Sequence, residues 1–168
     1  MRAEGAGWRM LGSSAVIAGS LGLALAVYSG ILAGEWIGSV SEWTARWTSS
    51  ALNLLGSSTS VNGTILSSDS FAVNIVAECT AVGPLVLFMG AVLAYPSVIR
   101  AKSIGWLLGL VVLTAVNLIR IMSLFWIGSA YPRYLDVAHL LVWQTAMILL
   151  AIVLWLFWVE KFAHARDR

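Results

Sequence analysis

Three side chains that can carry covalent chemistry interrupt the apolar stretches of this 168-residue chain: Cys79, Arg120 and His139. A cysteine with a nearby histidine is the smallest nucleophile–base pair, because the imidazole can take the thiol proton and leave a thiolate that attacks a carbonyl carbon. An arginine can then stabilise the oxyanion of the tetrahedral intermediate. If the fold brings the three together, the sequence predicts acyl transfer through a thioester.

Two polar residues precede the arginine and the histidine. Asn117 comes three residues before Arg120, so on a helix both face the same way, and its amide can hold the guanidinium or pack against another helix. Asp136 comes three residues before His139 and is the predicted N-cap of a helix. Because a helix N-terminus disfavours imidazolium, this placement favours a neutral His139 that can act as a base. We expect both residues, together with Glu78 next to the cysteine, to support the site.

Each candidate also has an explanation without catalysis. A lone cysteine in a membrane helix is usually a small packing residue. Glu78, beside Cys79, can form a structural ion pair with Arg120, and His139 can lie at a helix end or at the membrane interface. Together these alternatives describe a non-catalytic membrane protein, either a transporter subunit or an assembly factor.

The single cysteine narrows the chemistry further. It excludes an intrachain disulfide and a multi-cysteine metal site, and we expect neither a metal nor a cofactor. Thiol redox exchange is disfavoured too, because that reaction normally needs a second, resolving cysteine.

The composition places these residues in a membrane. Hydrophobic residues make up 60% of the chain and charged residues only 11%, with nine tryptophans, whereas globular proteins carry roughly 25% charged residues. The net charge of +2 comes from scattered Lys and Arg, which disfavours nucleic-acid binding. The length fits one domain. We therefore expect a single integral membrane domain over residues 1–168, with membrane lipid around it.

Four apolar stretches are long enough to cross a bilayer, which takes about 20 residues of helix. The first, residues 10–34, follows Arg2 and Arg9 as a signal peptide would, but its 25 uncharged residues exceed the roughly 7–15 of a signal-peptide core. We interpret it as a retained helix, and the fold as an all-α, four-transmembrane-helix bundle. The predicted crossings are residues 10–34, 71–99, 103–130 and 137–159.

The basic residues set the predicted orientation, because cytoplasmic loops are enriched in Lys and Arg. Seven fall on one side of the predicted crossings and two on the other, which places both termini in the cytoplasm and residues 35–70 outside. The seven are Arg2, Arg9, Arg100, Lys102, Lys161, Arg166 and Arg168, and the two are Arg46 and Arg133.

The predicted external loop has two parts. Its first half has an amphipathic pattern, which predicts a helix whose tryptophans lie at the membrane interface and shield the bundle. The recurring residues are Trp36, Val40, Trp43, Trp47, Ala51 and Leu54. In the second half, residues 61–65 carry an Asn-Gly pair typical of a tight hairpin. This hairpin-like loop is either a plain connector or a strand edge for an extended peptide.

The predicted topology brings the three reactive residues to one depth. Cys79 comes eight residues after Phe71, and Arg120 comes eight residues before Gly128. At a rise of 1.5 Å per residue, each lies ~12 Å below the outer end of its helix. His139 lies within a turn of the outer surface. We therefore expect all three in the outer leaflet, on three different helices.

These residues resemble, in order and spacing, the three motifs of the exosortase/archaeosortase family. The motifs are a Cys followed by Ser/Thr and Gly, an Asn-x-x-Arg and a later His. They correspond here to Glu78-Cys79-Thr80-Ala81, Asn117-Leu118-Ile119-Arg120-Ile121 and His139. The resemblance covers roughly residues 61–158, and the short chain looks like the compact branch, of the exosortase H type. Ala81 departs from the pattern, since the family usually has Gly there.

The resemblance implies an activity, a set of partners and a location. The family consists of polytopic membrane cysteine transpeptidases acting on secreted proteins that end in a short motif, a transmembrane helix and a basic cluster. Cys79, Arg120 and His139 would be the catalytic positions. Cleavage at the outer face of the cytoplasmic (inner) membrane would leave a thioester, which an acceptor on a lipid or polysaccharide would resolve.

Overall fold

The computed structural model describes residues 26, 29–30 and 34–163. The chain divides into two units, residues 1–34 and residues 35–168. The predicted first crossing, residues 10–34, lies almost entirely outside the described residues. The single domain and the count of four crossings therefore stay predictions, and the description below concerns the second unit.

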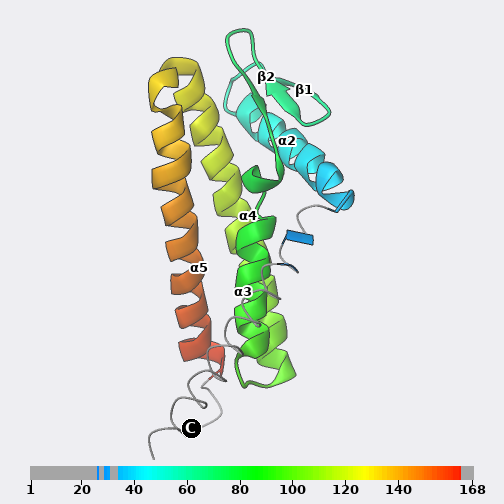
Figure 1. Ribbon diagram of the computed structural model, residues 1–168, viewed down its shortest axis with the longest axis vertical. Helices are drawn as coiled ribbons and strands as arrows, with labels where there is room; N and C mark the ends of the chain where they lie inside the picture. Colours follow the sequence, from blue (N-terminus) through cyan, green and yellow to red (C-terminus); the bar gives the residue numbers. More distant parts are fainter. Residues whose placement is uncertain (1–25, 27–28, 31–33, 164–168) are drawn as a thin grey trace, which may run out of the picture. The chain divides into compact units, whose positions relative to one another are not determined.

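The second unit is mostly helical and carries a small sheet (Figure 1). Two of its helical stretches, Ile99–Ala130 and Pro132–Ala163, have 32 residues each and are apolar enough to cross a membrane. The elements in chain order are α2 (Trp36–Leu54), β1 (Ser60–Asn62), β2 (Ile65–Ser67), β3 (Ala72–Asn74), a 3-10 turn (Ala77–Cys79), α3 (Val82–Ala94), α4 (Ile99–Ala130), a 3-10 turn (Pro132–Tyr134), a π-helical stretch (Val137–Trp143), α5 (Gln144–Trp158) and a second π-helical stretch (Val159–Ala163).

The predicted hairpin is present. β1 and β2 pair antiparallel with Val61 opposite Leu66 and Asn62 opposite Ile65. The two loop residues are Gly63 and Thr64, of which only Gly63 has a positive φ, +59°. A positive φ at the first loop position alone is the pattern of a type II′ turn, which favours glycine there. The glycine thus sets the turn, and the preceding asparagine belongs to the strand.

The predicted amphipathic helix is present as α2. Its inner face is made of small and polar residues with one leucine, whereas the predicted tryptophan face is exposed. In its last turn, the Asn53 side chain is bonded to the Thr59 backbone, accepting from its N–H (2.8 Å) and donating to its carbonyl (3.0 Å). This clamp fixes the connection from α2 to β1.

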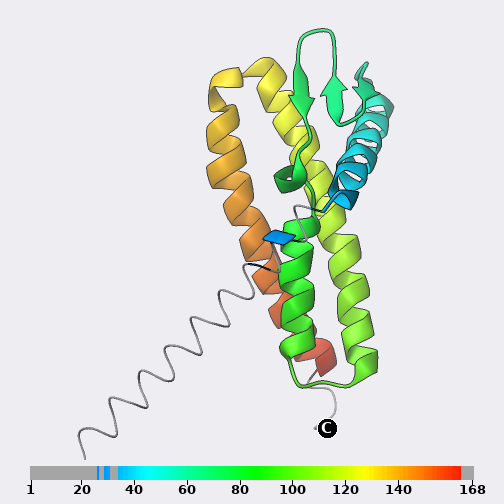
Figure 2. The ribbon, with the colours of Figure 1, turned by 45° about the vertical axis from the view of Figure 1, so that its right-hand side comes forward.

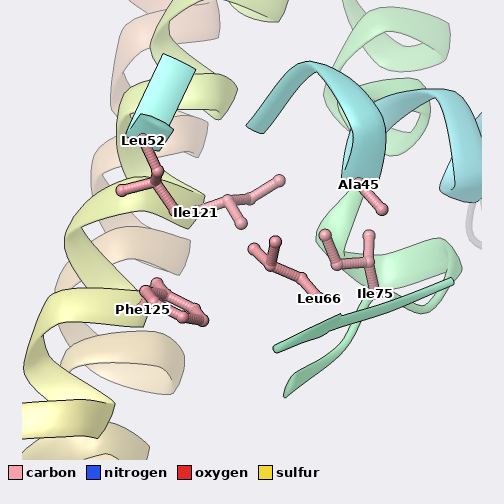
Figure 3. Packing of buried hydrophobic residues seen from close by; sticks show 6 residues of the cluster. All are labelled: Ala45, Leu52, Leu66, Ile75, Ile121 and Phe125. Atoms are coloured by element: carbon pink, nitrogen blue, oxygen red, sulfur yellow. The ribbon is translucent and has the colours of Figure 1, made fainter. Parts of the chain in front are cut away.

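We call residues 35–81 the cap, because α2, the sheet and the first 3-10 turn pack together on the C-terminal half of α4 (Figure 1). Figure 3 shows the core of this contact. Its members are Ala45, Leu52, Leu66, Ile75, Ile121 and Phe125. The Phe71 ring meets Phe125 edge-on at 5.4 Å and lies so close to Gly128 that a Cβ there would be 2.3 Å from the ring.

The prediction of one helix over residues 71–99 is wrong. β3 pairs with β2, and Ile75 is buried in the cap core. The first part of this apolar stretch therefore belongs to the sheet and its core, and not to a helix. α3 is a 13-residue helix that starts at Val82. It ends before Tyr95, whose extended backbone (φ −73°, ψ 131°) is the conformation favoured before a proline, here Pro96. The all-α prediction accordingly missed the sheet.

We call α3, the N-terminal half of α4 and the C-terminal half of α5 the bundle (Figure 2). Glycines let its helices approach closely. A Cβ at Gly109 would lie 2.4 Å from the Phe88 ring, and one at Gly105 would lie 2.6 Å from Trp158. Trp158 is fully buried, and its indole N–H donates to the Ala101 carbonyl (2.7 Å). Small residues at close helix crossings are typical of membrane helices.

Both long helices begin earlier than predicted. α4 starts at Ile99 instead of residue 103, so Arg100 and Lys102 lie in its first turn. The Lys102 ammonium donates to the Leu93 carbonyl at the end of α3 (2.7 Å), which satisfies a helix-end acceptor. The last helical stretch starts at Pro132 instead of residue 137. The outward faces of both helices expose many large apolar side chains, which suit an apolar environment.

Candidate active site

Cys79 lies at the end of the 3-10 turn that joins the sheet to α3, and it is half-buried. The buried Thr80 fixes this turn, because its hydroxyl donates to the Ala77 carbonyl (2.7 Å) and accepts from the Val82 N–H (3.4 Å). Ala81 has a φ of −74°, which any residue adopts, so the turn after the cysteine does not require glycine. The thiol is therefore held on an irregular segment and not within a helix.

Asn117 connects this segment to α4. Its amide nitrogen donates to the Cys79 carbonyl (2.9 Å), and its amide oxygen accepts from Arg120 Nη1 (3.5 Å). Both Asn117 and Arg120 are only 2% exposed. The predicted contact between these two residues is confirmed. The bond to Cys79 was not predicted, because nothing local in the sequence relates two residues 38 positions apart.

Arg120 keeps two donors free. Its Nε and Nη2 are buried and have no hydrogen-bond partner among the described residues. These two N–H groups lie on one edge of the planar guanidinium and point the same way, a geometry suited to oxygen acceptors. Buried donors without partners are rare in folded proteins and call for an explanation. The free edge can bind an oxygen that arrives with a substrate.

The structural ion pair between Glu78 and Arg120 is not formed. Glu78 is exposed whereas Arg120 is buried. The ion pairs within residues 34–163 are Arg46–Glu42 and Lys161–Glu160, both on exposed side chains. This ion pair therefore does not account for the buried Arg120, and the non-catalytic alternative loses the contact on which it depended.

His139 lies in the π-helical stretch that precedes α5. Its Nε2 is buried and without a hydrogen-bond partner in the part of the chain that is described, and the imidazole interacts electrostatically with Arg120 and Asp136. The predicted N-cap role of Asp136 is wrong, because this residue has helical backbone angles (φ −64°, ψ −42°) and makes no capping bond. Single π-helical turns often occur at functional sites.

The structure brings Cys79 to α4 by a route that the sequence did not predict, and the common depth and the catalytic roles of the three residues stay predictions. Cys79 is not eight residues into a helix, since no helix precedes it in this region. It is brought to α4 by the cap core and by the Asn117 bond, close enough to interact electrostatically with Arg120. Residues from the cap, from α4 and from the stretch before α5 thus gather around one guanidinium. No group of three or more His, Cys, Asp or Glu within the described ranges is placed to hold a metal ion.

Comparison with known families agrees with these motifs. The model of the transmembrane exosortase family (Exosortase_EpsH) matches residues 5–142, a stretch that contains all three candidate residues. The chain therefore belongs to the transmembrane exosortase family and is a membrane protein. No curated protein and no solved structure matches the chain.

Proposed function

We propose that this protein is a membrane cysteine transpeptidase that cleaves C-terminal sorting signals of secreted proteins and transfers the product to an acceptor. Family membership supports a peptidase or transpeptidase activity. The observation that carries the finer proposal is the Asn117 amide, which joins the Cys79 backbone to an arginine with two free buried donors. A nucleophile and an oxyanion-binding group are thus held by one side chain.

The first half of the reaction forms a thioester. His139 takes the proton from the Cys79 thiol, and the sulfur attacks the carbonyl carbon of the scissile peptide bond. The carbonyl electron pair moves onto oxygen, where the free edge of Arg120 donates hydrogen bonds to the negative charge. The intermediate then collapses, the C–N bond breaks, and the leaving amine takes the proton from His139.

The second half releases the thiol. A hydroxyl or amine of the acceptor, or water, loses its proton to His139 and attacks the thioester carbonyl. The C–S bond breaks, and the thiolate regains the proton. We propose secreted proteins with a motif, a transmembrane helix and a basic cluster as substrates, and a lipid or polysaccharide as acceptor.

The proposed orientation places the cap and the active site outside the cytoplasmic membrane, and both termini inside. The seven-to-two distribution of basic residues supports it. In a Cys79→Ala background, single cysteines at the exposed positions 60 and 103 test it with a membrane-impermeant thiol reagent. We expect labelling at position 60 in intact cells, and at position 103 only after lysis. External labelling at position 103 would reverse the orientation.

The activity is tested with a secreted reporter that ends in a candidate sorting signal from the same genome. Co-expression with the wild-type protein should shorten the reporter, as seen by immunoblot, whereas Cys79→Ala should leave it uncleaved at an unchanged level of membrane-inserted enzyme. Glu78→Gln is the matched control, because it alters the adjacent exposed residue without touching the thiol. Wild-type processing by Cys79→Ala would refute the proposed nucleophile.

A further inference from the structure

A cavity of about 270 Å³ lies directly beside the site, between α2 and the start of α3, against the middle of α4. Two of its lining residues belong to the site as well. Asn117 holds the Cys79 carbonyl, and Ala81 follows Cys79 by two residues. The cavity therefore adjoins the segment that carries Cys79, on the side of Asn117 and Ala81.

The polar groups in the cavity wall are mostly engaged elsewhere. The Asn117 amide is used at both ends, by Cys79 and by Arg120. The Thr44 hydroxyl donates to the Val40 carbonyl of its own helix (2.8 Å). Thr114 supplies the remaining hydroxyl, and the other lining residues are apolar. The cavity thus offers hydrophobic contact, which favours an apolar occupant.

The cavity extends from the site toward the bundle. Along α4 its lining runs from Asn117 back to Leu110, a distance of about 10 Å at 1.5 Å per residue. Leu110 is 49% exposed and Trp47, on α2, is 57% exposed, so the cavity has apolar side chains at its opening. Figure 2 shows α2 beside α4 and the start of α3, the three helices that supply most of the lining residues. An apolar segment that enters the membrane next to Cys79 would pass this opening.

The volume indicates the size of group that can enter. An apolar cavity of roughly 150 Å³ can hold a benzene-sized group, so the 270 Å³ found here are enough for one large apolar side chain. Such a side chain can project into the cavity from a helix that lies against its opening.

We propose that this cavity is a specificity subsite, which binds a large apolar side chain from the first turns of the substrate's transmembrane helix, after the scissile bond. The inference rests on the proposed function, because it takes Cys79 as the point of cleavage. Binding there would hold the membrane segment while the bond before it is broken. The subsite would therefore select substrates by the size of one apolar residue.

Cross-linking tests occupancy without requiring turnover. Thr114→Cys in a Cys79→Ala background leaves one cysteine in the cavity wall. The partner is a reporter whose processing by wild-type protein depends on Cys79, with a single cysteine scanned through the first two turns of its apolar segment. We expect disulfide formation with Thr114→Cys in membranes. Ala115→Cys, on the exposed face of the same helix, is the matched control and should stay uncross-linked. Equal cross-linking at both positions, or none at Thr114→Cys, would overturn the proposal.

A second arm tests whether the chain fills the cavity itself. Single cysteines introduced through residues 10–34 should not cross-link to Thr114→Cys. If one of them does so in membranes without reporter, the cavity belongs to the protein's own first crossing and the subsite proposal is wrong.

Substrate ranking tests specificity. Wild-type enzyme should process a reporter with Leu at the cross-linking position at least about tenfold faster, in kcat/KM, than one with Ala, since a lost side chain in an apolar pocket has an effect of that order. Thr114→Phe fills the cavity and should remove or reverse this preference, whereas Ala115→Phe should keep it. An unchanged ranking in Thr114→Phe would overturn the subsite while leaving the Cys79 chemistry intact. A reporter still processed by Cys79→Ala would instead refute the proposed function.

Discussion

The cap and the bundle pack on opposite halves of α4 by different means. The cap combines a small apolar core with side-chain clamps, such as the bonds between Asn53 and Thr59, and a three-stranded sheet. The bundle depends on glycines against aromatic rings, with Trp158 as its largest fully buried side chain. Polar clamps are suited to a region in contact with water, and close small-residue packing to one surrounded by lipid.

The active-site candidates lie where these two regions meet. Cys79 lies near the end of the cap, at the last position of its 3-10 turn, and Asn117 and Arg120 belong to the middle of α4. A non-helical backbone near membrane depth is tolerated where protein covers it, and here the cap and the Asn117 bond provide that cover. An irregular, polar segment is therefore held at the edge of an apolar bundle because the cap packs over it.

Of the variants that keep Cys79, His139→Ala is expected to have the largest effect. His139→Ala should lower the rate of reporter processing by about 10²–10⁴, because it removes the general base. The variant should keep the wild-type thermal midpoint in detergent, since His139 is only half-buried. A processing rate within a few-fold of wild type would remove His139 from the mechanism.

Arg120→Lys should lower the processing rate by about 10²–10³, because a point charge cannot reproduce the two parallel donors of the free guanidinium edge. Glu78→Gln should retain activity, since Glu78 is exposed and unpaired with Arg120. The two variants are compared in a single reporter assay. If Arg120→Lys keeps wild-type activity while Glu78→Gln inactivates the protein, then Arg120 acts through its charge and not through the geometry of its donors.

The packing of the bundle is tested with a pair of glycines. Gly109→Ala places a Cβ 2.4 Å from the Phe88 ring and should destabilise the protein by about 1–3 kcal/mol, measured from the thermal midpoint in detergent. Gly90→Ala is the matched control on α3, because nothing lies within 4 Å of its Cβ. It should be neutral or slightly stabilising. Equal destabilisation by both would show that close packing at Gly109 is not what holds the bundle.

The smallest effect is expected in the cap. Asn53→Ala removes the clamp on Thr59 and should have a cost of about 1 kcal/mol, confined to the cap because the two cores are separate. Hydrogen exchange should accelerate in β1 and β2 and remain unchanged in α3. Acceleration in α3 as well would show that the cap and the bundle unfold as one unit.

Much of this arrangement was predictable from the sequence, and the exceptions are informative. α4 and the last helix follow from long apolar stretches, and α2 and the hairpin follow from periodicity and the glycine turn. The prediction for the stretch from Phe71 was wrong because β3 pairs with β2 of the neighbouring hairpin. Hydropathy alone cannot distinguish such a short apolar strand from the start of a membrane helix. Pro84, near the start of α3, and Pro96, just after its end, were the local signals for a shorter helix.

The catalytic roles of the candidate residues stay predictions, and only part of their spatial arrangement could be predicted from the sequence. The spacing of Asn117 and Arg120 places them on one helix face, as observed. The bond from Asn117 to Cys79 depends on the packing of the cap, which no local pattern encodes. The π-helical stretch at His139 was not predicted from the sequence either.

The most direct test of the central claim is to trap the acyl-enzyme on Cys79. The full-length protein in membranes is incubated with the reporter without acceptor and quenched in acid, and the peptide containing Cys79 is examined by mass spectrometry. We predict a covalent adduct on this peptide with the mass of the reporter peptide that ends at the cleavage site, attached through its new C-terminal carbonyl and released by hydroxylamine as a thioester is. Accumulation of cleaved reporter while the Cys79 peptide stays unmodified would contradict the account.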